Sequence, residues 1–194
     1  MKRILWVVLL VAVALPLAAF ADSSIDFTNS GGTLTGSSAG LTLTDSTLVK
    51  IGSTLGSNLG TVSFTTGSIA SGDLQNGATF NSGGTFTIVS STDGTLFSGS
   101  FDCTSACTWT LVTSANGTNH YTLTGGLVGT WKNGSTVYGA TVQITIDTGK
   151  SLFGGSTSIS SGDTNIVVPE PGSLALMGTG LVGLAGVIRR KLKA

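Results

Sequence analysis

Apolar and polar residues alternate along residues 121–146, and this is the clearest pattern in the chain. The dipeptide Asn133-Gly134 interrupts the alternation and favours a two-residue turn between antiparallel strands. If Lys132 faces Ser135, every pair on one face is apolar or glycine: Gly129–Tyr138, Leu127–Ala140, Gly125–Val142, Leu123–Ile144 and Tyr121–Ile146. A slip of one residue would invert the two faces. The pattern therefore predicts a half-buried antiparallel hairpin, with Gly129 leaving room for the ring of Tyr138.

A second hairpin is predicted around the two cysteines of the chain, Cys103 and Cys107. Placing them opposite each other makes Phe101 face Trp109, with all four residues on the inward side. Opposed strand positions have Cα separations that a disulfide accepts, so we expect a Cys103–Cys107 disulfide. Closing so small a loop contributes only about 2 kcal/mol. A redox or metal site is the alternative, but it usually needs a second pair of thiols or a helix between the cysteines.

Further short strands are expected at residues 25–27, 33–43, 46–51, 60–65, 79–89 and 95–101, separated by Gly, Asn and Asp turns. About ten short strands indicate an all-β fold, an antiparallel β-sandwich or jelly-roll-like domain whose two sheets bury their apolar faces against each other. A right-handed β-helix is the main alternative, because Gly/Ser/Thr-rich segments also stack as solenoid rungs. It lacks support from any fixed repeat period.

Three aromatic residues, Trp109, Trp131 and Tyr138, are candidates for stacking on a sugar. Their positions in the alternation place them on the inward faces, so core packing is the first expectation. Trp131 lies beside the predicted turn. It is therefore the best candidate for a partly exposed ring that stacks on a ligand.

Residues 22–168 contain 24 glycines, 24 serines and 29 threonines, a composition that favours strands and turns over helices. Three lysines accompany eight aspartates there, so this region has a formal charge of −5 although the whole chain sums to zero. Nucleic-acid binding needs clustered Lys or Arg, and we expect none.

The candidates for catalysis and metal binding in this region are few. His120 could act as a general base, but it stands near a turn without a recognisable nucleophile motif. Two aspartates could in principle flank a glycosidic bond, although the sequence favours no pair. Asp93-Gly94, Asp147-Thr148-Gly149 and Asp163-Thr164-Asn165 lack the alternating acidic spacing of a calcium loop, and we interpret them as turns. We expect no cofactor and no metal.

The N-terminus has the pattern of a secretory signal peptide over residues 1–21. Lys2-Arg3 precede an apolar run over residues 4–15, and Ala19 and Ala21 are the small residues that signal peptidase requires. A membrane-spanning helix is the alternative, but the run is short and Pro16 interrupts it. We expect cleavage after Ala21, and hence an exported protein in which a disulfide can persist.

The C-terminal tail combines Pro169-Glu170-Pro171 with an apolar run and the basic residues Arg189, Arg190 and Lys191. It resembles the PEP-CTERM sorting signal of Gram-negative bacteria. The resemblance implies recognition of Pro169, Glu170 and Pro171 by an exosortase, a membrane-embedded processing enzyme. Residues 172–188 would form a transmembrane helix of about 25 Å, just long enough to cross a bilayer. The basic end would act as the stop and orientation signal.

The expected organisation is a signal peptide (1–21), a β-sandwich domain (22–150), a Gly/Ser-rich linker (151–168) and the sorting signal (169–194). The resemblance implies an inner-membrane anchor before processing, and then a location at the cell surface or outside the cell, with exopolysaccharide or biofilm as the setting. We therefore expect a non-enzymatic surface or matrix protein. A carbohydrate-binding module or adhesin is the alternative, and a hydrolase that uses two aspartates, or His120 with an aspartate, is a third possibility.

Overall fold

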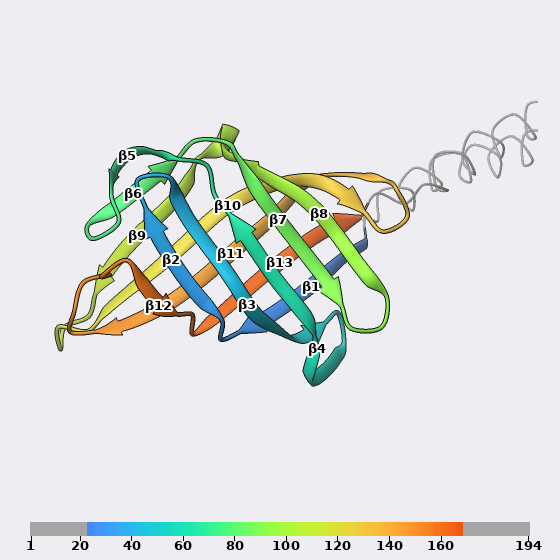
Figure 1. The fold of residues 1–194 in the computed structure, drawn as a ribbon, viewed down its shortest axis with the longest axis horizontal. Helices are drawn as coiled ribbons and strands as arrows, with labels where there is room; N and C mark the ends of the chain where they lie inside the picture. The colour runs from blue at the N-terminus through green and yellow to red at the C-terminus, as the bar shows by residue number, and fades with distance from the viewer. Residues whose placement is uncertain (1–22, 169–194) are drawn as a thin grey trace, which may run out of the picture. The chain divides into compact units, whose positions relative to one another are not determined.

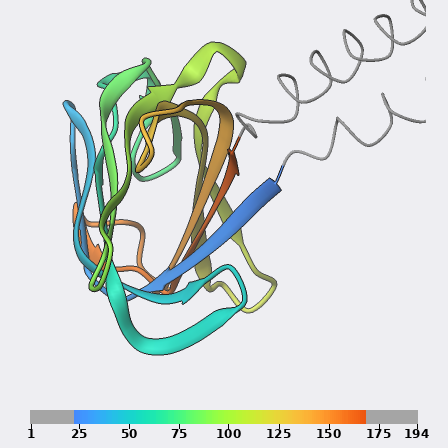
Figure 2. The ribbon, with the colours of Figure 1, turned by 90° about the vertical axis from the view of Figure 1, so that its right-hand side faces the viewer.

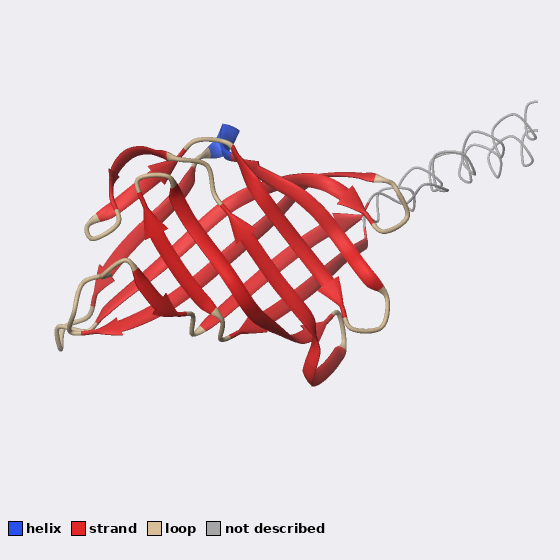
Figure 3. Cartoon of the chain, viewed as in Figure 1, coloured by secondary structure: helices blue, strands red, loops and turns tan. Residues whose placement is uncertain are grey.

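Thirteen β-strands make up most of the part of the chain that this computed structural model describes, residues 23–168 (Figure 3). A short 3-10 turn, η1 (Cys103–Ser105), separates β8 from β9. In chain order the strands are β1 (Ser23–Ser30), β2 (Thr33–Ser37), β3 (Gly40–Ile51), β4 (Thr54–Thr65), β5 (Ile69–Asp73), β6 (Gly77–Phe80), β7 (Gly83–Ser90), β8 (Gly94–Asp102), β9 (Cys107–Thr113), β10 (Asn119–Trp131), β11 (Thr136–Gly149), β12 (Ser156–Ser158) and β13 (Ser161–Val168). The predicted all-β class is confirmed.

Eight of the strands form a closed antiparallel barrel (Figure 1). Each pairs with the next in the order β11, β13, β1, β3, β4, β7, β8 and β10, and β10 pairs again with β11. Figure 2 shows the sheet curving around its interior. The predicted sandwich of two sheets is therefore corrected to one sheet that closes on itself. Closure depends on pairing β1 with β13 from opposite ends of the described chain, and alternation within single strands carries no information about such a distant partner.

Several barrel strands are interrupted, and both pieces stay beside the same neighbour. Strand β8 pairs with residues 126–131 of β10, whereas β9 pairs with residues 119–124 on the same edge. Strands β1 and β2 likewise follow each other along β3. Strands β9, β6 and β5 extend the sheet from β10 beyond the closed ring, and β2 and β12 extend it from β3.

The barrel interior is a packed core. Its largest feature is a four-phenylalanine cluster from β4, β7 and β8, in which Phe86 stacks on Phe64 with ring centroids 5.9 Å apart. Phe86 also meets the edges of Phe97 and Phe101 at 6.3 and 5.9 Å. All four rings are buried. The alternation of these strands explains the packing, since inward positions hold the rings and outward positions hold Ser or Thr.

A second aromatic group fills the core where β9 and β10 extend toward the β5–β6 turn. Trp109 stacks on Tyr121 at 5.0 Å, and Phe153 meets Trp109 at 5.6 Å. The polar atoms of both larger rings are satisfied: Trp109 Nε1 donates to the carbonyl of Leu74 (3.0 Å), and the Tyr121 hydroxyl donates to the carbonyl of Gln75 (2.7 Å). Buried Trp and Tyr need such partners, so the β5–β6 turn and this group stabilise each other.

The predicted β10–β11 hairpin is confirmed over most of its length. Four of the five predicted pairs occur, from Tyr121–Ile146 to Leu127–Ala140. Nearer the turn the register shifts, and Gly129 pairs with Val137. The loop holds Lys132, Asn133 and Gly134 between Trp131 and Ser135, one residue more than the predicted turn, and an irregularity between Leu127 and Gly129 restores the inner register.

This shift overturns two predictions: that Tyr138 faces inward, and that Gly129 leaves room for its ring. Val137 takes the inward position, and Tyr138 faces outward with 71% of its surface exposed. A Cβ at Gly129 would meet the ring of Phe97, not that of Tyr138. Trp131 is only 8% exposed and packs on Phe27, with ring centroids 6.1 Å apart. Its ring is therefore not available to stack on a ligand.

The predicted disulfide joins Cys103 to Cys107, with Cα atoms 4.9 Å apart. The hairpin expected around it is wrong, because β8 and β9 run in the same direction along β10. The bridge closes a short excursion between two collinear strand segments, and Ala106 adopts a positive φ of 75° there. The carboxylate of Asp102 accepts hydrogen bonds from the Thr104 hydroxyl and backbone N–H, which holds the pKa of that carboxyl below its usual value. The inward phase of Phe101, Cys107 and Trp109 is as predicted.

The predicted linker over residues 151–168 is also corrected. Residues 161–168 form β13, an integral strand of the barrel, and β12 pairs with β2. The inward positions of β13 are Gly162, Thr164 and Ile166. Glycine and threonine at two of three buried positions hide the alternation that would otherwise have identified a strand.

Candidate functional site

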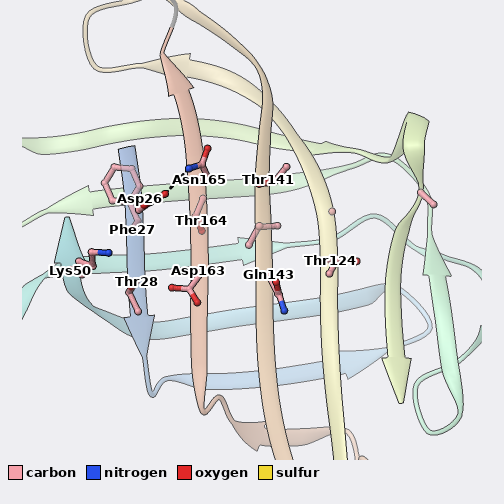
Figure 4. Close-up of a pocket in the computed structure, with 13 residues that line it drawn as sticks. Asp26, Phe27, Thr28, Lys50, Thr124, Thr141, Gln143, Asp163, Thr164 and Asn165 are labelled. Atoms are coloured by element: carbon pink, nitrogen blue, oxygen red, sulfur yellow. Dashed lines mark hydrogen bonds between the residues drawn. The ribbon is translucent and has the colours of Figure 1, made fainter. Parts of the chain in front are cut away.

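A depression of about 560 Å³ lies on the outer face of the barrel, across β10, β11, β13 and β1 (Figure 4). We call it the outer trough. Lys50 of β3 lies at one end, and Ala106, beside the disulfide, lies at the other. The outward side chains used below are Asp26, Thr124, Thr141, Gln143, Asp163 and Asn165.

The strand register arranges these side chains in two rows. Thr124 pairs with Gln143, and Gln143 pairs with Asp163, so three neighbouring strands supply one row. Thr141 pairs with Asn165 in the next row. Thr124, Thr141, Gln143 and Asp163 are exposed and Asn165 is half-buried. Figure 4 shows Asp26 beside Asn165. The two rows occupy the polar phase of the same alternation whose apolar phase fills the core.

The trough offers both donors and acceptors of hydrogen bonds. The amide of Asn165 donates to a carboxylate oxygen of Asp26, which ties β13 to β1. Gln143 contributes a second amide, Thr124 and Thr141 contribute hydroxyls, and Asp163 contributes a second carboxylate. Lys50 is the one cation of its lining. This set can bind a polar, uncharged ligand through many weak contacts.

Beneath this face, the interior of the β1–β13 seam is unusually polar. The Asn29 amide donates to the Ser46 hydroxyl at 2.7 Å, and both residues are buried. Asn29 Oδ1 and the hydroxyl of Thr164 are buried without a hydrogen-bond partner. A Cβ at Gly162 would lie 2.6 Å from Asn29 Oδ1, so a larger residue there would require the Asn29 side chain to move.

The structure brings His120 beside an aspartate, which is one part of what the hydrolase hypothesis required. His120 Nδ1 lies 3.7 Å from Asp147 Oδ2, with the side chains 37% and 49% exposed. The two residues are cross-strand partners on β10 and β11. Neither lines the outer trough.

The aspartate turns have local partners. Asp93 lies 3.7 Å from Lys132, and Asp147 accepts a hydrogen bond from the backbone N–H of Gly149. Asp163 lies within β13, so its predicted turn is corrected to a strand. Within residues 23–168, no three His, Cys, Asp or Glu side chains lie close enough together to hold a metal ion.

The two ends of the described chain are neighbours. Strand β1 begins, and β13 ends, at the same end of the barrel, because the two strands pair antiparallel (Figure 1). Pro169 directly follows the last residue of β13. The predicted recognition residues Pro169–Pro171, the basic residues Arg189–Lys191, the signal-peptidase residues Ala19 and Ala21 and the predicted helix 172–188 all lie outside the described residues. Within residues 23–168, no helix is long and apolar enough to cross a bilayer.

Comparison with protein families identifies the tail. Residues 167–191 match the family described as the PEP-CTERM protein-sorting motif. The tail is a PEP-CTERM sorting signal. It marks an exported protein that an exosortase-type enzyme processes and sorts to the surface. Neither the curated proteins nor the solved structures include a match to the chain.

The sequence did not single out the outer trough. Alternation assigns Thr124, Thr141 and Gln143 to an outward face, and that signal was available. It could not show that β13 and β1 continue this face, because Asp26 and Asn165 are 139 positions apart. Only the closure of the barrel brings their side chains together.

Proposed function

We propose that this protein is a non-enzymatic component of the cell surface or extracellular matrix, associated with exopolysaccharide. The observation that carries the proposal is the sorting motif, whose match begins at Val167, inside the strand that closes the barrel. The sorting signal therefore follows the folded domain in the sequence without a linker. The tail delivers a domain that ends where the signal begins.

The proposed route uses both ends of the chain. Signal peptidase cleaves after Ala21, residues 172–188 hold the protein in the inner membrane, and Arg189, Arg190 and Lys191 keep the end of the tail on the cytoplasmic side. The exosortase-type enzyme then recognises Pro169-Glu170-Pro171 and releases or transfers the domain to the surface.

We favour a non-enzymatic role because the aspartates and the histidine considered for catalysis lie on open strand faces. Asp26, Asp147 and Asp163 are exposed, and His120 is half-buried. Catalytic groups usually converge in an enclosed pocket, and an open sheet face encloses little.

A carbohydrate-binding module or adhesin is the second candidate. Trp131 packs in the core, which was the first expectation, so the best candidate for stacking on a sugar does not support this function. The outer trough supports the candidate on different grounds, because it presents a hydrogen-bonding surface of mixed donors and acceptors.

The test of the proposed function is the intact mass and fractionation of the protein expressed in its own host. The wild type should lose its tail and reach the surface or medium. The variant Pro169→Ala/Glu170→Ala/Pro171→Ala should keep its tail and remain in the membrane fraction. A matched control, Ser53→Ala/Ser57→Ala/Asn58→Ala, changes three exposed residues near the β3–β4 turn and should behave as the wild type. Tail loss in all three proteins, or in none, would refute recognition through the Pro-Glu-Pro element.

A further inference from the structure

We propose that the outer trough binds a neutral polysaccharide by hydrogen bonds to the hydroxyl groups of the sugars. The proposal deepens the proposed function and rests on it, since only an exported protein meets extracellular polysaccharide. It assigns the contact to Thr124, Thr141, Gln143, Asp163 and Asn165, on three adjacent strands.

The spacing of the rows suits an extended ligand that crosses the strands. Neighbouring strands lie about 4.8 Å apart, so Thr124, Gln143 and Asp163 present hydrogen-bonding groups over about 10 Å. The row of Thr141 and Asn165 is two residues away along the strands, or about 7 Å. A chain molecule lying along the trough contacts one strand after another (Figure 4).

The lining chemistry selects against charged ligands. Two carboxylates, Asp26 and Asp163, outnumber the one ammonium group of Lys50, so a phosphate, sulfate or uronate would meet net repulsion. The domain as a whole has the same sign, with eight aspartates and three lysines in residues 22–168. Hydroxyl groups both donate and accept, and the amides, hydroxyls and carboxylates of the trough match them on both counts.

A protein partner fits the trough less well than a polysaccharide. The centre of a protein interface is usually depleted of charge and enriched in aromatic residues. The large apolar side chains that are exposed in the described residues, Leu55, Val112, Tyr138 and Leu152, all lie outside the lining. Phe27 is the one aromatic residue of the lining, and it is fully buried. Without an exposed aromatic ring each site is weak, and many copies on one surface would provide avidity.

The experiment is affinity electrophoresis of the processed protein, purified from its host, in gels that contain polysaccharide. The probes are the host exopolysaccharide fraction that passes through an anion-exchange column, and alginate as an anionic comparison. The variant Gln143→Ala/Asp163→Ala/Asn165→Ala removes the trough groups. The control Thr61→Ala/Ser63→Ala/Ser98→Ala removes hydroxyls from outward positions of β4 and β8. A third variant, Gln143→Glu, keeps the side-chain shape and replaces an amide with a further carboxylate.

The neutral fraction should retard the wild type and the control, and alginate should not. The trough variant should lose at least about tenfold in apparent affinity, because three hydrogen-bonding side chains are removed. Gln143→Glu should weaken retardation at an unchanged melting temperature, which separates loss of binding from loss of fold.

Three results would overturn the proposal: equal retardation of wild type and trough variant, retardation by alginate alone, or release of reducing sugar from the neutral fraction. A concentration-dependent dimer that the trough variant abolishes would identify a second copy of the chain as the occupant, and would also overturn it. Tail processing of each variant is followed by mass in parallel. Normal processing without retardation would refute this inference alone and leave the proposed function standing.

Discussion

Two walls of the barrel fill its interior with different kinds of side chain. The aromatic wall, β4, β7 and β8, fills its side of the interior with Phe64, Phe86, Phe97 and Phe101 at centroid distances of 5.5–6.3 Å. The closing wall, β11, β13 and β1, places Asn29, Gly162 and Thr164 among its inward positions. The aromatic wall packs large rings against one another, whereas the closing wall combines buried apolar residues such as Val142, Ile144 and Ile166 with buried polar atoms that have no partner.

The difference follows from how the walls are joined. Neighbouring strands of the aromatic wall are joined to form an antiparallel β7–β8 hairpin, and β4 lies beside it. The closing wall instead joins the first and last strands of the described chain. Its outer face is also the face that carries the outer trough. Packing strength is therefore concentrated away from the face to which we assign binding.

The largest effect should come from the aromatic wall. Phe86→Ala removes the ring that contacts the other three phenylalanines and should lower the free energy of unfolding by about 3–5 kcal/mol. Urea unfolding of the purified protein measures it. The control Thr87→Ala, at the next, outward position of β7, should cost less than about 1 kcal/mol. Equal losses in the two variants would show that the cluster does not dominate the core.

The disulfide should matter less than the rings beside it. Replacing Cys103 and Cys107 by serine opens a loop of five residues and should cost about 2 kcal/mol in the chain-entropy account. The same unfolding assay applies, with dithiothreitol-treated wild type as the comparison. A loss as large as that of Phe86→Ala would mean that the aromatic wall depends on the bridge to hold β8 and β9 in register with β10.

The sequence predicted neighbouring strands of the barrel unequally, because their inward residues differ in kind. In β10 and β11 the inward residues are mainly apolar, so alternation predicted both strands and four of their pairs. In β13 the inward Gly162 and Thr164 resemble turn or linker residues, and a barrel strand was predicted as a linker. A strand whose buried face is small and polar has no apolar period to detect.

Local pairing rules failed where the partner is distant in sequence. The cysteines have the spacing of a hairpin, yet β8 and β9 are collinear because β10 supplies the partner for both. The outer trough was missed for the same reason, since Asp26 and Asn165 meet only when β1 pairs with β13. The sorting motif, by contrast, is contiguous, and its residues were identified directly.

A smaller effect of opposite sign should come from the closing wall. Thr164→Val replaces a buried hydroxyl that has no partner with a methyl group of similar shape, and should raise the free energy of unfolding by about 1 kcal/mol. Asn165→Ala, at the adjacent outward position, provides the comparison and should not stabilise. A loss of stability in Thr164→Val would indicate that a buried water bridges Thr164 and Asn29, since a polar cavity can hold one.

The smallest effect should be local opening of the ends of β5 and β8 in acid. The carboxyl of Asp73 accepts hydrogen bonds from the side chain and backbone N–H of Asn76 and from the backbone N–H of Gln75, which lowers its pKa. Hydrogen bonds from Thr104 lower the pKa of Asp102 in the same way. Asp102 ends β8, and Asp73 ends β5, which follows β4 in the chain and pairs with β6 in the sheet.

Because the folded-state pKa of each group lies below its unfolded value, the stability that it contributes is present above the ordinary aspartate pKa. That contribution is lost as the pH falls through the lowered folded-state value. Hydrogen exchange should therefore show the ends of β5 and β8 opening below about pH 4 before β1 and β13 do. Asp73→Asn/Asp102→Asn should flatten this pH dependence, since amides do not titrate. Earlier opening of β1 and β13 in the wild type would instead make the polar seam, and not the aspartate-held turns, the acid-sensitive part of the barrel.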